Sequence, residues 1–279
     1  MKASAKLAVL SVAALGALAV AAPANAETVV PCGGGKGAET VSGSLSIAAG
    51  ETCVLDGTTV TGNVYAGNGS SVFLLGSTVS GNIRVGAGAY LDATGGGING
   101  TVTAQTAVGV RLAGVHVGGS VKSYSSSATN TGFVFTDGAT IDGALDVVAP
   151  GEVLLERSNV GASVRGIGSQ YTHLFMSTVG GNVTVKDNPG GAVACGSTVD
   201  GDGTFSGNSG TVQLGAGSVF NCSATNNWGD DLVVSYNTAN LTVTNNVIED
   251  DLSGFCNAPA PTGSNNQVGG TKSGQFKNL

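Results

Sequence analysis

An internal repeat of about 19 residues limits the folds open to this chain more than any other sequence feature. The repeat units begin at Thr59, Thr78, Gly97, His116, Thr140, Asn159, Thr178 and Thr198. The intervals between these positions are 19, 19, 19, 24, 19, 19 and 20 residues, and the unit of 24 carries an insertion within residues 123–130. A typical unit opens as T-V-x-G-N-V and closes as V-x-L-x-G-S. A period this regular indicates a solenoid in which one unit forms one coil.

The apolar residues of each unit alternate with Gly, Thr, Ser and Asn, which is the pattern of β-strands. The second position is occupied by Val60, Val79, Ile98, Val117, Ile141, Val160, Val179 and Val199, and the sixth by Val64, Ile83, Val102, Val121, Leu145, Val164 and Val183. A coil of this size cannot bury its apolar side chains alone, but coils stacked about 4.8 Å apart close a continuous narrow core. The sequence therefore predicts an all-β, single-domain parallel β-helix, right-handed, with about 19 residues per coil.

The two ends of the chain differ from the repeats. Residues 1–26 combine a basic start, an apolar run from Leu7 to Ala22 and the ending Ala24-Asn25-Ala26, which are the features of a secretory signal peptide. We expect residues 27–37 to be a linker, residues 38–258 to form the β-helix, and residues 259–279 to form a cap, because prolines interrupt strand pairing. No stretch after the signal peptide is apolar enough to cross a membrane. These features predict a secreted, extracellular or cell-wall-associated protein.

Charge and residue content exclude several function classes. Removing the two lysines of residues 1–26 from the 11 basic residues leaves 9 against 18 acidic residues, so nucleic acid is not an expected partner. The chain contains two histidines, His116 and His173, which we place at outward positions of different columns. Neither provides a base for a serine or cysteine nucleophile. We therefore expect no catalytic residues.

Five cysteines remain after the expected cleavage, so at least one thiol is unpaired or pairs with another molecule. We predict a disulfide between Cys32 and Cys53, which would fasten the first coil. Alignment of the repeats assigns Cys195 to the inward column of Leu74, Leu112 and Leu155, as a buried free thiol.

Polar residues at the turns are expected to stabilise the coils through hydrogen bonds. In the last coils, a functional site is an alternative explanation. Asn63, Asn82 and Asn182 recur at one turn and are expected to form hydrogen-bonded ladders. Five carboxylates of the last coils are expected to lie close together: Asp230, Asp231, Glu249, Asp250 and Asp251. They are solvated turn charges, a calcium site, or a pair of catalytic carboxylates as in pectin-degrading β-helix glycosidases. The Gly-His-Gly and Arg-x-Lys motifs of those enzymes do not occur in this chain. Calcium is the one cofactor that the sequence suggests.

A second candidate site is the seventh position of the units, which faces solvent. Its members include Tyr65, Arg84, Lys122 and Arg165. The three basic residues lie on alternate coils, so they would be about 9.6 Å apart along one face, a spacing suited to an extended acidic polysaccharide. Asp146 interrupts the row, and scattered solvated charges are the alternative.

The repeats and the carboxyl-terminal pattern together resemble a group of small secreted bacterial β-helix proteins of unknown function. The residues that carry the resemblance are the T-V-x-G-N-V repeats and the ending Asn245-Asn246, Leu252, Cys256, Pro259-Ala260-Pro261-Thr262-Gly263, Asn266, Val268-Gly269-Gly270 and Gly274-Gln275. The resemblance implies an architecture and no chemistry. Similar proteins carry a cysteine after the final Gly-Gln, where this chain has Phe276. The closing disulfide that the resemblance implies for Cys256 then needs another partner, and we assign Cys222.

The sequence as a whole predicts a secreted, non-enzymatic structural or surface-binding protein. The candidate partner is an extracellular or cell-wall polysaccharide. The alternative is a polysaccharide lyase or glycosidase of the pectin-lyase-like fold, which rests on fold analogy.

Overall fold

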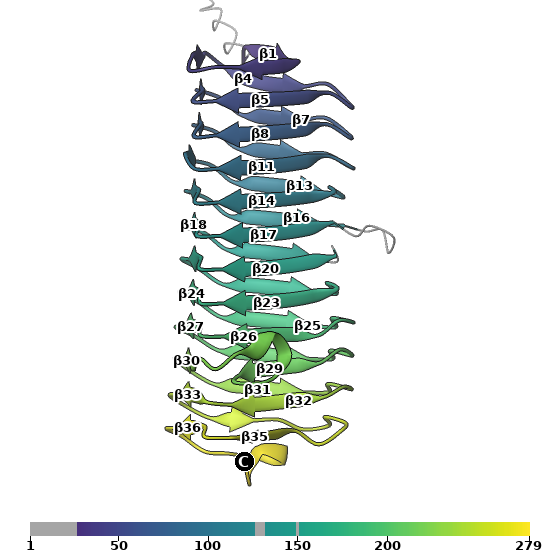
Figure 1. Cartoon of the computed structure of the whole chain (residues 1–279), viewed down its shortest axis with the longest axis vertical. Coiled ribbons are helices and arrows are strands. Elements are labelled where there is room, and N and C mark those ends of the chain that lie inside the picture. Colours follow the sequence, from purple (N-terminus) through teal and green to yellow (C-terminus); the bar gives the residue numbers. More distant parts are fainter. Residues whose placement is uncertain (1–26, 126–131, 149–150) are drawn as a thin grey trace, which may run out of the picture.

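The computed structural model describes residues 27–125, 132–148 and 151–279. The predicted signal peptide of residues 1–26 lies outside the described residues, as do residues 126–130 of the insertion expected within 123–130. The described chain winds into a parallel β-solenoid of three 12-stranded sheets. Each coil contributes one strand to each sheet, which gives about 12 turns stacked along the long axis (Figure 1). The predicted all-β solenoid with about 19 residues per turn is confirmed.

Sheet A contains β1 (Val29–Cys32), β4 (Ser44–Ile47), β7 (Val64–Ala66), β10 (Ile83–Val85), β13 (Val102–Gln105), β16 (Val121–Tyr124), β19 (Leu145–Val148), β22 (Val164–Ile167), β25 (Val183–Lys186), β28 (Gly203–Ser206), β31 (Leu232–Ser235) and β34 (Leu252–Ser253). Sheet B contains β2 (Gly34–Lys36), β5 (Thr52–Asp56), β8 (Ser71–Leu75), β11 (Tyr90–Thr94), β14 (Gly109–Ala113), β17 (Phe133–Asp137), β20 (Glu152–Glu156), β23 (Tyr171–Phe175), β26 (Ala192–Cys195), β29 (Val212–Gly215), β32 (Leu241–Thr244) and β35 (Thr262–Ser264). Sheet C contains β3 (Thr40–Val41), β6 (Thr59–Val60), β9 (Thr78–Val79), β12 (Gly97–Ile98), β15 (His116–Val117), β18 (Thr140–Ile141), β21 (Asn159–Val160), β24 (Thr178–Val179), β27 (Thr198–Val199), β30 (Asn226–Trp228), β33 (Asn246–Ile248) and β36 (Gln267–Val268). Two short 3-10 helices complete the described elements, η1 (Val219–Asn221) and η2 (Gly274–Phe276).

The core is the narrow space between the three sheets. Strand pairing is parallel and in register, so equivalent residues of successive coils form columns. Val60 of sheet C and Val64 of sheet A are both fully buried, as the repeat pattern predicts. In the five-residue strands of sheet B, the second and fourth side chains point inward and the first, third and fifth outward, as in β8 and β11. The outer face of sheet B therefore presents three columns of side chains.

The solenoid extends further at both ends than the sequence boundaries of 38 and 258 suggested. Residues 27–37, expected to be a linker, supply β1 and β2, which pair with β4 and β5. Residues 259–279, expected to be a cap, supply β35 and β36 before η2 closes the end with the buried side chain of Phe276. Pro259 and Pro261 fall between β34 and β35, where the chain needs no strand donor, so they do not end the solenoid.

Side-chain ladders link the coils at the corners. The predicted ladder is confirmed: Asn82 N–H donates to Asn63 Oδ1 at 2.8 Å, and Asp202 N–H donates to Asn182 Oδ1 at 3.1 Å. A second ladder is buried from Asn188 to Asn257 and ends at the half-buried Gln275. Its backbone N–H groups donate to the side-chain oxygen of the next coil at 2.7 to 3.1 Å, through Asn188, Asn208, Asn237, Asn257 and Gln275. Because a buried amide without a partner is costly, this ladder fixes the register of the last coils.

We expect Asn237→Ala to destabilise the solenoid strongly. The change removes the acceptor of the backbone N–H of Asn208 (3.1 Å) and of its side-chain amide (2.8 Å) in a site with no exposure. The cost should be about 3 kcal/mol, which lowers Tm by roughly 6–12 °C. Asn182→Ala in the exposed ladder is the matched control and should cost less than about 1 kcal/mol, because water can replace the lost acceptor. Equal melting temperatures for the two variants would contradict this account.

Candidate functional site

The structure places the predicted basic row of sheet A in one column but pairs part of it. The register aligns Tyr65 with Arg84 and, further along, Lys122 with Asp146 and Asp146 with Arg165. Arg165 binds Asp146 through Nε at 2.7 Å and Nη2 at 3.2 Å. The Arg165 guanidinium is therefore paired with a carboxylate of the same column. Tyr65 and Arg84 instead line a groove of about 380 Å³ at the amino-terminal end of the sheet.

The five carboxylates of the last coils do not form a ligand set. Asp231 Oδ1 accepts the backbone N–H of Asp251 at 2.9 Å, and Asp251 Oδ1 accepts that of Thr271 at 2.7 Å. These two aspartates thus continue the ladder of Asn63 and Asn182. Within the described ranges, no three His, Cys, Asp or Glu side chains gather closely enough to hold a metal ion. The side chains predicted to bind calcium, those of Asp230, Asp231, Glu249, Asp250 and Asp251, therefore do not converge on one point in the described structure.

One predicted disulfide is confirmed and the other cysteine assignments are wrong. Cys32 and Cys53 are bonded, with Cα atoms 5.8 Å apart. Cys222 bonds to Cys195, with Cα atoms 6.0 Å apart, and Cys256 is free and exposed. The register pairs Leu174 with Ala194 and Phe175 with Cys195, so Cys195 lies one residue beyond the inward column to which it was assigned. A shift of one residue moves a strand side chain to the opposite face, which brings Cys195 within reach of Cys222 outside the core.

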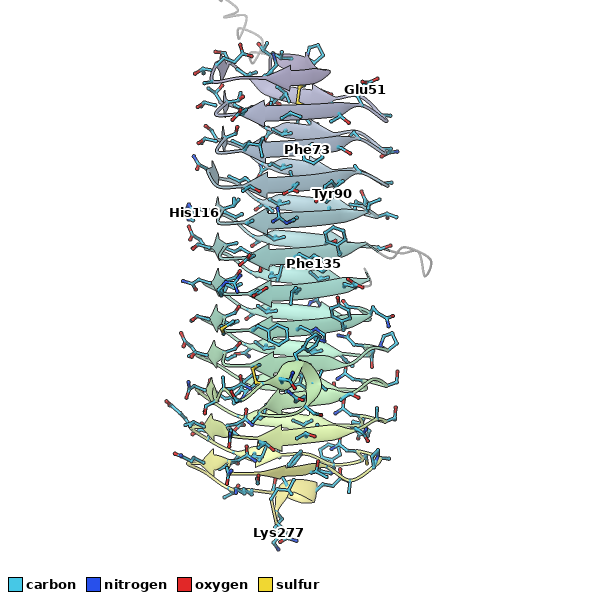
Figure 2. The ribbon with its side chains drawn as sticks, in the orientation of Figure 1. Glu51, Phe73, Tyr90, His116, Phe135 and Lys277 are labelled. Carbon is cyan, nitrogen blue, oxygen red and sulfur yellow. A yellow bond between two sulfur atoms is a disulfide. The ribbon has the colours of Figure 1, made fainter. Side chains whose placement is uncertain are left out.

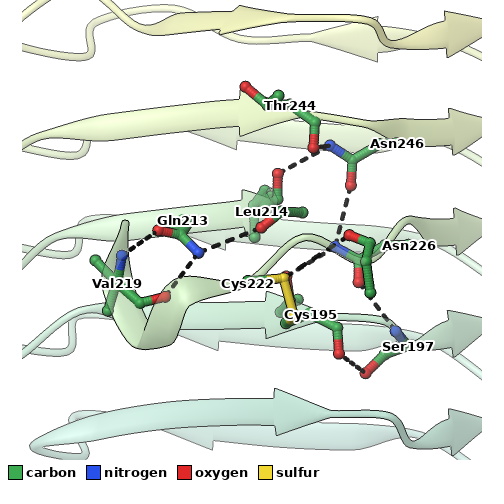
Figure 3. The surroundings of a disulfide bond; sticks show 12 residues. Cys195, Ser197, Gln213, Leu214, Val219, Cys222, Asn226, Thr244 and Asn246 are labelled. Atoms are coloured by element: carbon green, nitrogen blue, oxygen red, sulfur yellow. Dashed lines mark hydrogen bonds between the residues drawn. A yellow bond between two sulfur atoms is a disulfide. The ribbon is translucent and has the colours of Figure 1, made fainter. Parts of the chain in front are cut away.

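The Cys195–Cys222 disulfide fastens a ten-residue segment, residues 216–225, that we call the strap. The strap joins β29 to β30 and contains η1, which lies in front of β26 and β29 on the outer face of sheet B (Figure 1). The buried side chain of Gln213 holds it as well: Oε1 accepts from Val219 N–H at 2.9 Å and Nε2 donates to Val219 O at 3.1 Å (Figure 3). Val219 and Cys222 pack on Val193 of β26. The strap is therefore a fixed wall across the sheet.

Aromatic side chains follow the outer face of sheet B from β8 to the strap. Phe73, Tyr90 and Phe135 lie on this face (Figure 2). The chain contains 8 Phe, 5 Tyr and 1 Trp, and seven of these aromatic residues lie on this face or on the strap. Ring centroids are 5.9 Å apart for Phe73 and Tyr90, 6.0 Å for Tyr90 and Phe133, and 4.4 Å for Phe133 and Phe135. The repeat pattern did not indicate this face, although the outward positions of the V-x-L segment carry Phe73, Phe135 and His173.

A second aromatic cluster lies at the strap. His173 stacks on Tyr171 with centroids 4.2 Å apart and meets Phe175 edge to face at 5.8 Å. Phe220 of the strap approaches His173 and Phe175 at 5.2 and 5.3 Å. Together with Met176, these side chains line a pocket of about 520 Å³. The strap thus completes a site that the sheet alone does not form.

Ion pairs connect the two aromatic clusters. Arg111 Nη1 binds Asp92 Oδ1 at 2.9 Å, and Arg157 binds both Asp137, at 2.6 Å, and Glu156. A smaller hollow of about 170 Å³, lined in part by Arg111, Phe135 and Asp137, shares Leu154 and Glu156 with the pocket at the strap. The two hollows are therefore parts of one groove, which we call the sheet B groove. Its walls alternate aromatic rings with paired charged groups.

His173 is the buried polar residue of this groove. Its side chain is 8% exposed, and burial lowers its pKa to about 4. None of the residues that the structure describes forms a hydrogen bond with either ring nitrogen, and both nitrogens keep some exposed surface. Burial and a hydrogen bond with Glu152 raise the pKa of Tyr171 to about 12. Both side chains are therefore neutral over the pH range in which proteins usually act.

Four of the ten described non-glycine residues with a positive φ lie at this site: Arg157, Met176, Phe220 and Asn221. The residue that follows the sheet B strand has a positive φ in successive coils, and glycine fills this position at Gly57, Gly76, Gly95, Gly114, Gly138 and Gly196. Two adjacent coils carry Arg157 (φ 47°) and Met176 (φ 48°) there instead, and Phe220 of the strap has φ 54°. A side chain in this region costs about 1–3 kcal/mol, and such residues cluster at functional sites. All three strained residues line the groove or bind its carboxylates.

Comparison with known proteins adds no relatives: no family model, no curated protein and no solved structure matches the chain. The resemblance to secreted bacterial β-helix proteins therefore stays a hypothesis. Over the described residues, no helix is long and apolar enough to span a membrane.

We expect Met176→Gly to leave the fold intact and to raise the free energy of unfolding by about 1 kcal/mol, because glycine adopts φ 48° without strain. Gly138→Ala is the matched control in the same column: an added Cβ meets no atom within 4 Å, so only the φ of +61° opposes it. This control should lose about 1 kcal/mol. Thermal melting measures both, and a lower Tm for Met176→Gly than for the native chain would contradict the assignment of strain.

The stability of the native chain should also depend on pH through His173. Above pH 6.5 the folded and unfolded chains both hold a neutral imidazole. Between pH 6.5 and about 4 the unfolded chain binds a proton that the folded chain does not, so the free energy of unfolding falls as the pH is lowered through this window. His173→Phe lacks this titration. The Tm of the native chain minus that of the variant should decrease from pH 7 to pH 4, and a constant difference would show that His173 is not buried in its neutral form.

Proposed function

We propose that this protein is a secreted, non-enzymatic β-solenoid that binds a neutral extracellular polysaccharide along the sheet B groove. The observation that carries the proposal is the outer face of sheet B, where aromatic rings alternate with paired Arg and Asp or Glu side chains and which is hollowed from Arg111 to the strap. Disulfides such as Cys32–Cys53 form in oxidising compartments, which supports export.

The chemistry of the groove matches that of a sugar chain. A pyranose ring has an apolar face of C–H groups, which packs on aromatic rings, and a rim of hydroxyls, which donate to carboxylates and accept from guanidinium groups. Phe73, Tyr90 and Phe135 are half-buried, so each ring keeps exposed surface for such contacts. Parallel strands repeat about every 4.8 Å, so rings on alternate or neighbouring coils can meet successive sugars of an extended chain.

Local charge favours a neutral glycan over the acidic one considered for the row on sheet A. The sheet B groove and its rim carry Asp92, Asp137, Glu152 and Glu156 against the two guanidinium groups of Arg111 and Arg157. The excess of carboxylates opposes a polyanion. The groove at Tyr65 and Arg84 of sheet A has, among the described residues, Arg84 as its one charged lining residue, with the Glu27 carboxylate 3.5 Å from the Tyr65 hydroxyl, and is the candidate surface for an acidic polysaccharide.

The lyase or glycosidase alternative now centres on Asp137 and Glu156. The register places these residues on adjacent strands, as a carboxylate pair for glycoside hydrolysis would require. Arg157 binds both side chains, so both carboxylates already have a partner within the protein. This arrangement supports binding over cleavage.

The test is retention of the protein on cellulose, chitin, β-1,3-glucan and mannan, with pectin and alginate as acidic polymers. We expect retention on a neutral polymer without new reducing or unsaturated ends. Tyr90→Ala with Phe135→Ala should weaken binding about thirtyfold, since each ring contributes about 1 kcal/mol. The matched control is Tyr236→Ala with Phe255→Ala, an exposed aromatic pair 5.2 Å apart outside the groove.

Three results would contradict the proposal. Equal losses in the two double variants would show that the groove is not the binding surface. Retention on pectin that is lost in Tyr65→Ala with Arg84→Ala would assign binding to sheet A. Product formation that disappears in Asp137→Asn with Glu156→Gln would show that the protein is an enzyme.

A further inference from the structure

The sheet B groove has one closed end. The strap crosses the sheet directly after β23, and the outward side chains beneath it, Val193 and Gln213, are each 2% exposed. Past this wall, β26, β29, β32 and β35 lie wholly within the described chain and carry no aromatic side chain. Toward β8 the rings of Tyr90 and Phe73 continue the aromatic face. A chain that follows the rings toward the strap therefore has to stop there.

The pocket at the closed end is also the larger of the two hollows in the groove. The pocket there has a volume of about 520 Å³, against about 170 Å³ for the hollow beside it. Phe220 forms its outer wall and is 63% exposed, and its backbone is held at φ 54° between the disulfide and the contacts of Gln213. A strained backbone that presents an exposed ring to a pocket is a feature of ligand clamps.

A polar group without a partner lies inside this pocket. The His173 side chain is more than nine-tenths buried and lines the cavity, and its ring nitrogens have no hydrogen-bond partner in the described structure. The lining also includes the polar side chains of Glu156, Tyr171, Asn221 and Ser223, which are half-buried or exposed, whereas His173 is buried. A hydroxyl of a bound ligand would supply the missing partner.

We infer that the pocket beneath the strap is a terminal subsite, which takes the end sugar of a neutral glycan chain, stacks it against the aromatic wall and binds one of its hydroxyls through His173. This inference rests on the proposed function and adds that the protein recognises chain ends. Binding along the chain alone would leave the strap, the strained Phe220 and the unpaired imidazole without a ligand.

The experiment measures how binding capacity depends on the number of chain ends. Whichever neutral polymer of the panel is retained most strongly is cut by partial acid hydrolysis into samples of equal mass and increasing end content. We expect the amount of native protein bound at saturation to rise in proportion to the ends. His173→Phe keeps a planar ring but removes both nitrogens and should bind about fivefold to tenfold more weakly. Phe220→Ala, at an exposed site, should show a similar loss.

Phe73→Ala is the matched control at the opposite end of the aromatic face. It should lower affinity while capacity still follows the number of ends. Melting curves without glycan verify that each variant is folded. Capacity that follows polymer mass and ignores chain ends would overturn the terminal subsite and leave the proposed function intact. Unchanged affinity in folded His173→Phe and Phe220→Ala would also overturn it. If no polymer of the panel is retained, the proposed function fails, and the terminal subsite fails with it.

Discussion

Backbone hydrogen bonds between stacked coils set the distance and the register at which the side chains of this solenoid meet. Because pairing is parallel and in register, residues repeated every 19 positions form a column. Successive members of that column lie about 4.8 Å apart. Inward columns of valine and leucine then form one apolar core, and corner columns of asparagine or serine supply acceptors to the next coil. The same rule acts outside the core, where it gathers aromatic side chains that are distant in sequence onto one face.

This rule explains why the fold could be predicted from the sequence. The repeat spacing gave both the solenoid and the column of Tyr65, Arg84, Lys122, Asp146 and Arg165, and the register confirms that column. The exposed ladder of Asn63 and Asn82 followed from the same alignment. The ends were harder to predict because their strands rely on backbone pairing with little apolar pattern: β2 is Gly-Gly-Lys, and β35 is Thr-Gly-Ser.

Most of the site could not be predicted from the sequence, for physical reasons. One extra residue before β26 places Cys195 outward, and an error of a single position in a strand reverses the face. Asp231 and Asp251 belong to an acidic cluster that suggests a metal site. In the structure each accepts a hydrogen bond from a backbone N–H through Oδ1, as the asparagines of the ladder do. Ion pairs such as Arg165–Asp146 depend on side-chain conformations that a repeat alignment does not contain. The strap is not part of a repeat unit, so the repeat pattern does not predict its contacts with His173 and Gln213.

The in-register columns also bear on how such a molecule can evolve. Each coil contacts its two neighbours, so the interactions that stabilise the rod are local along its axis. A whole coil added or lost near the amino-terminal end, away from β8 to β29, would shift the register by one complete unit and leave the columns of the groove aligned. Rod length and ligand recognition are therefore separable traits. Selection can lengthen or shorten the distance between the groove and the end of the rod in steps of one coil while the binding surface stays the same.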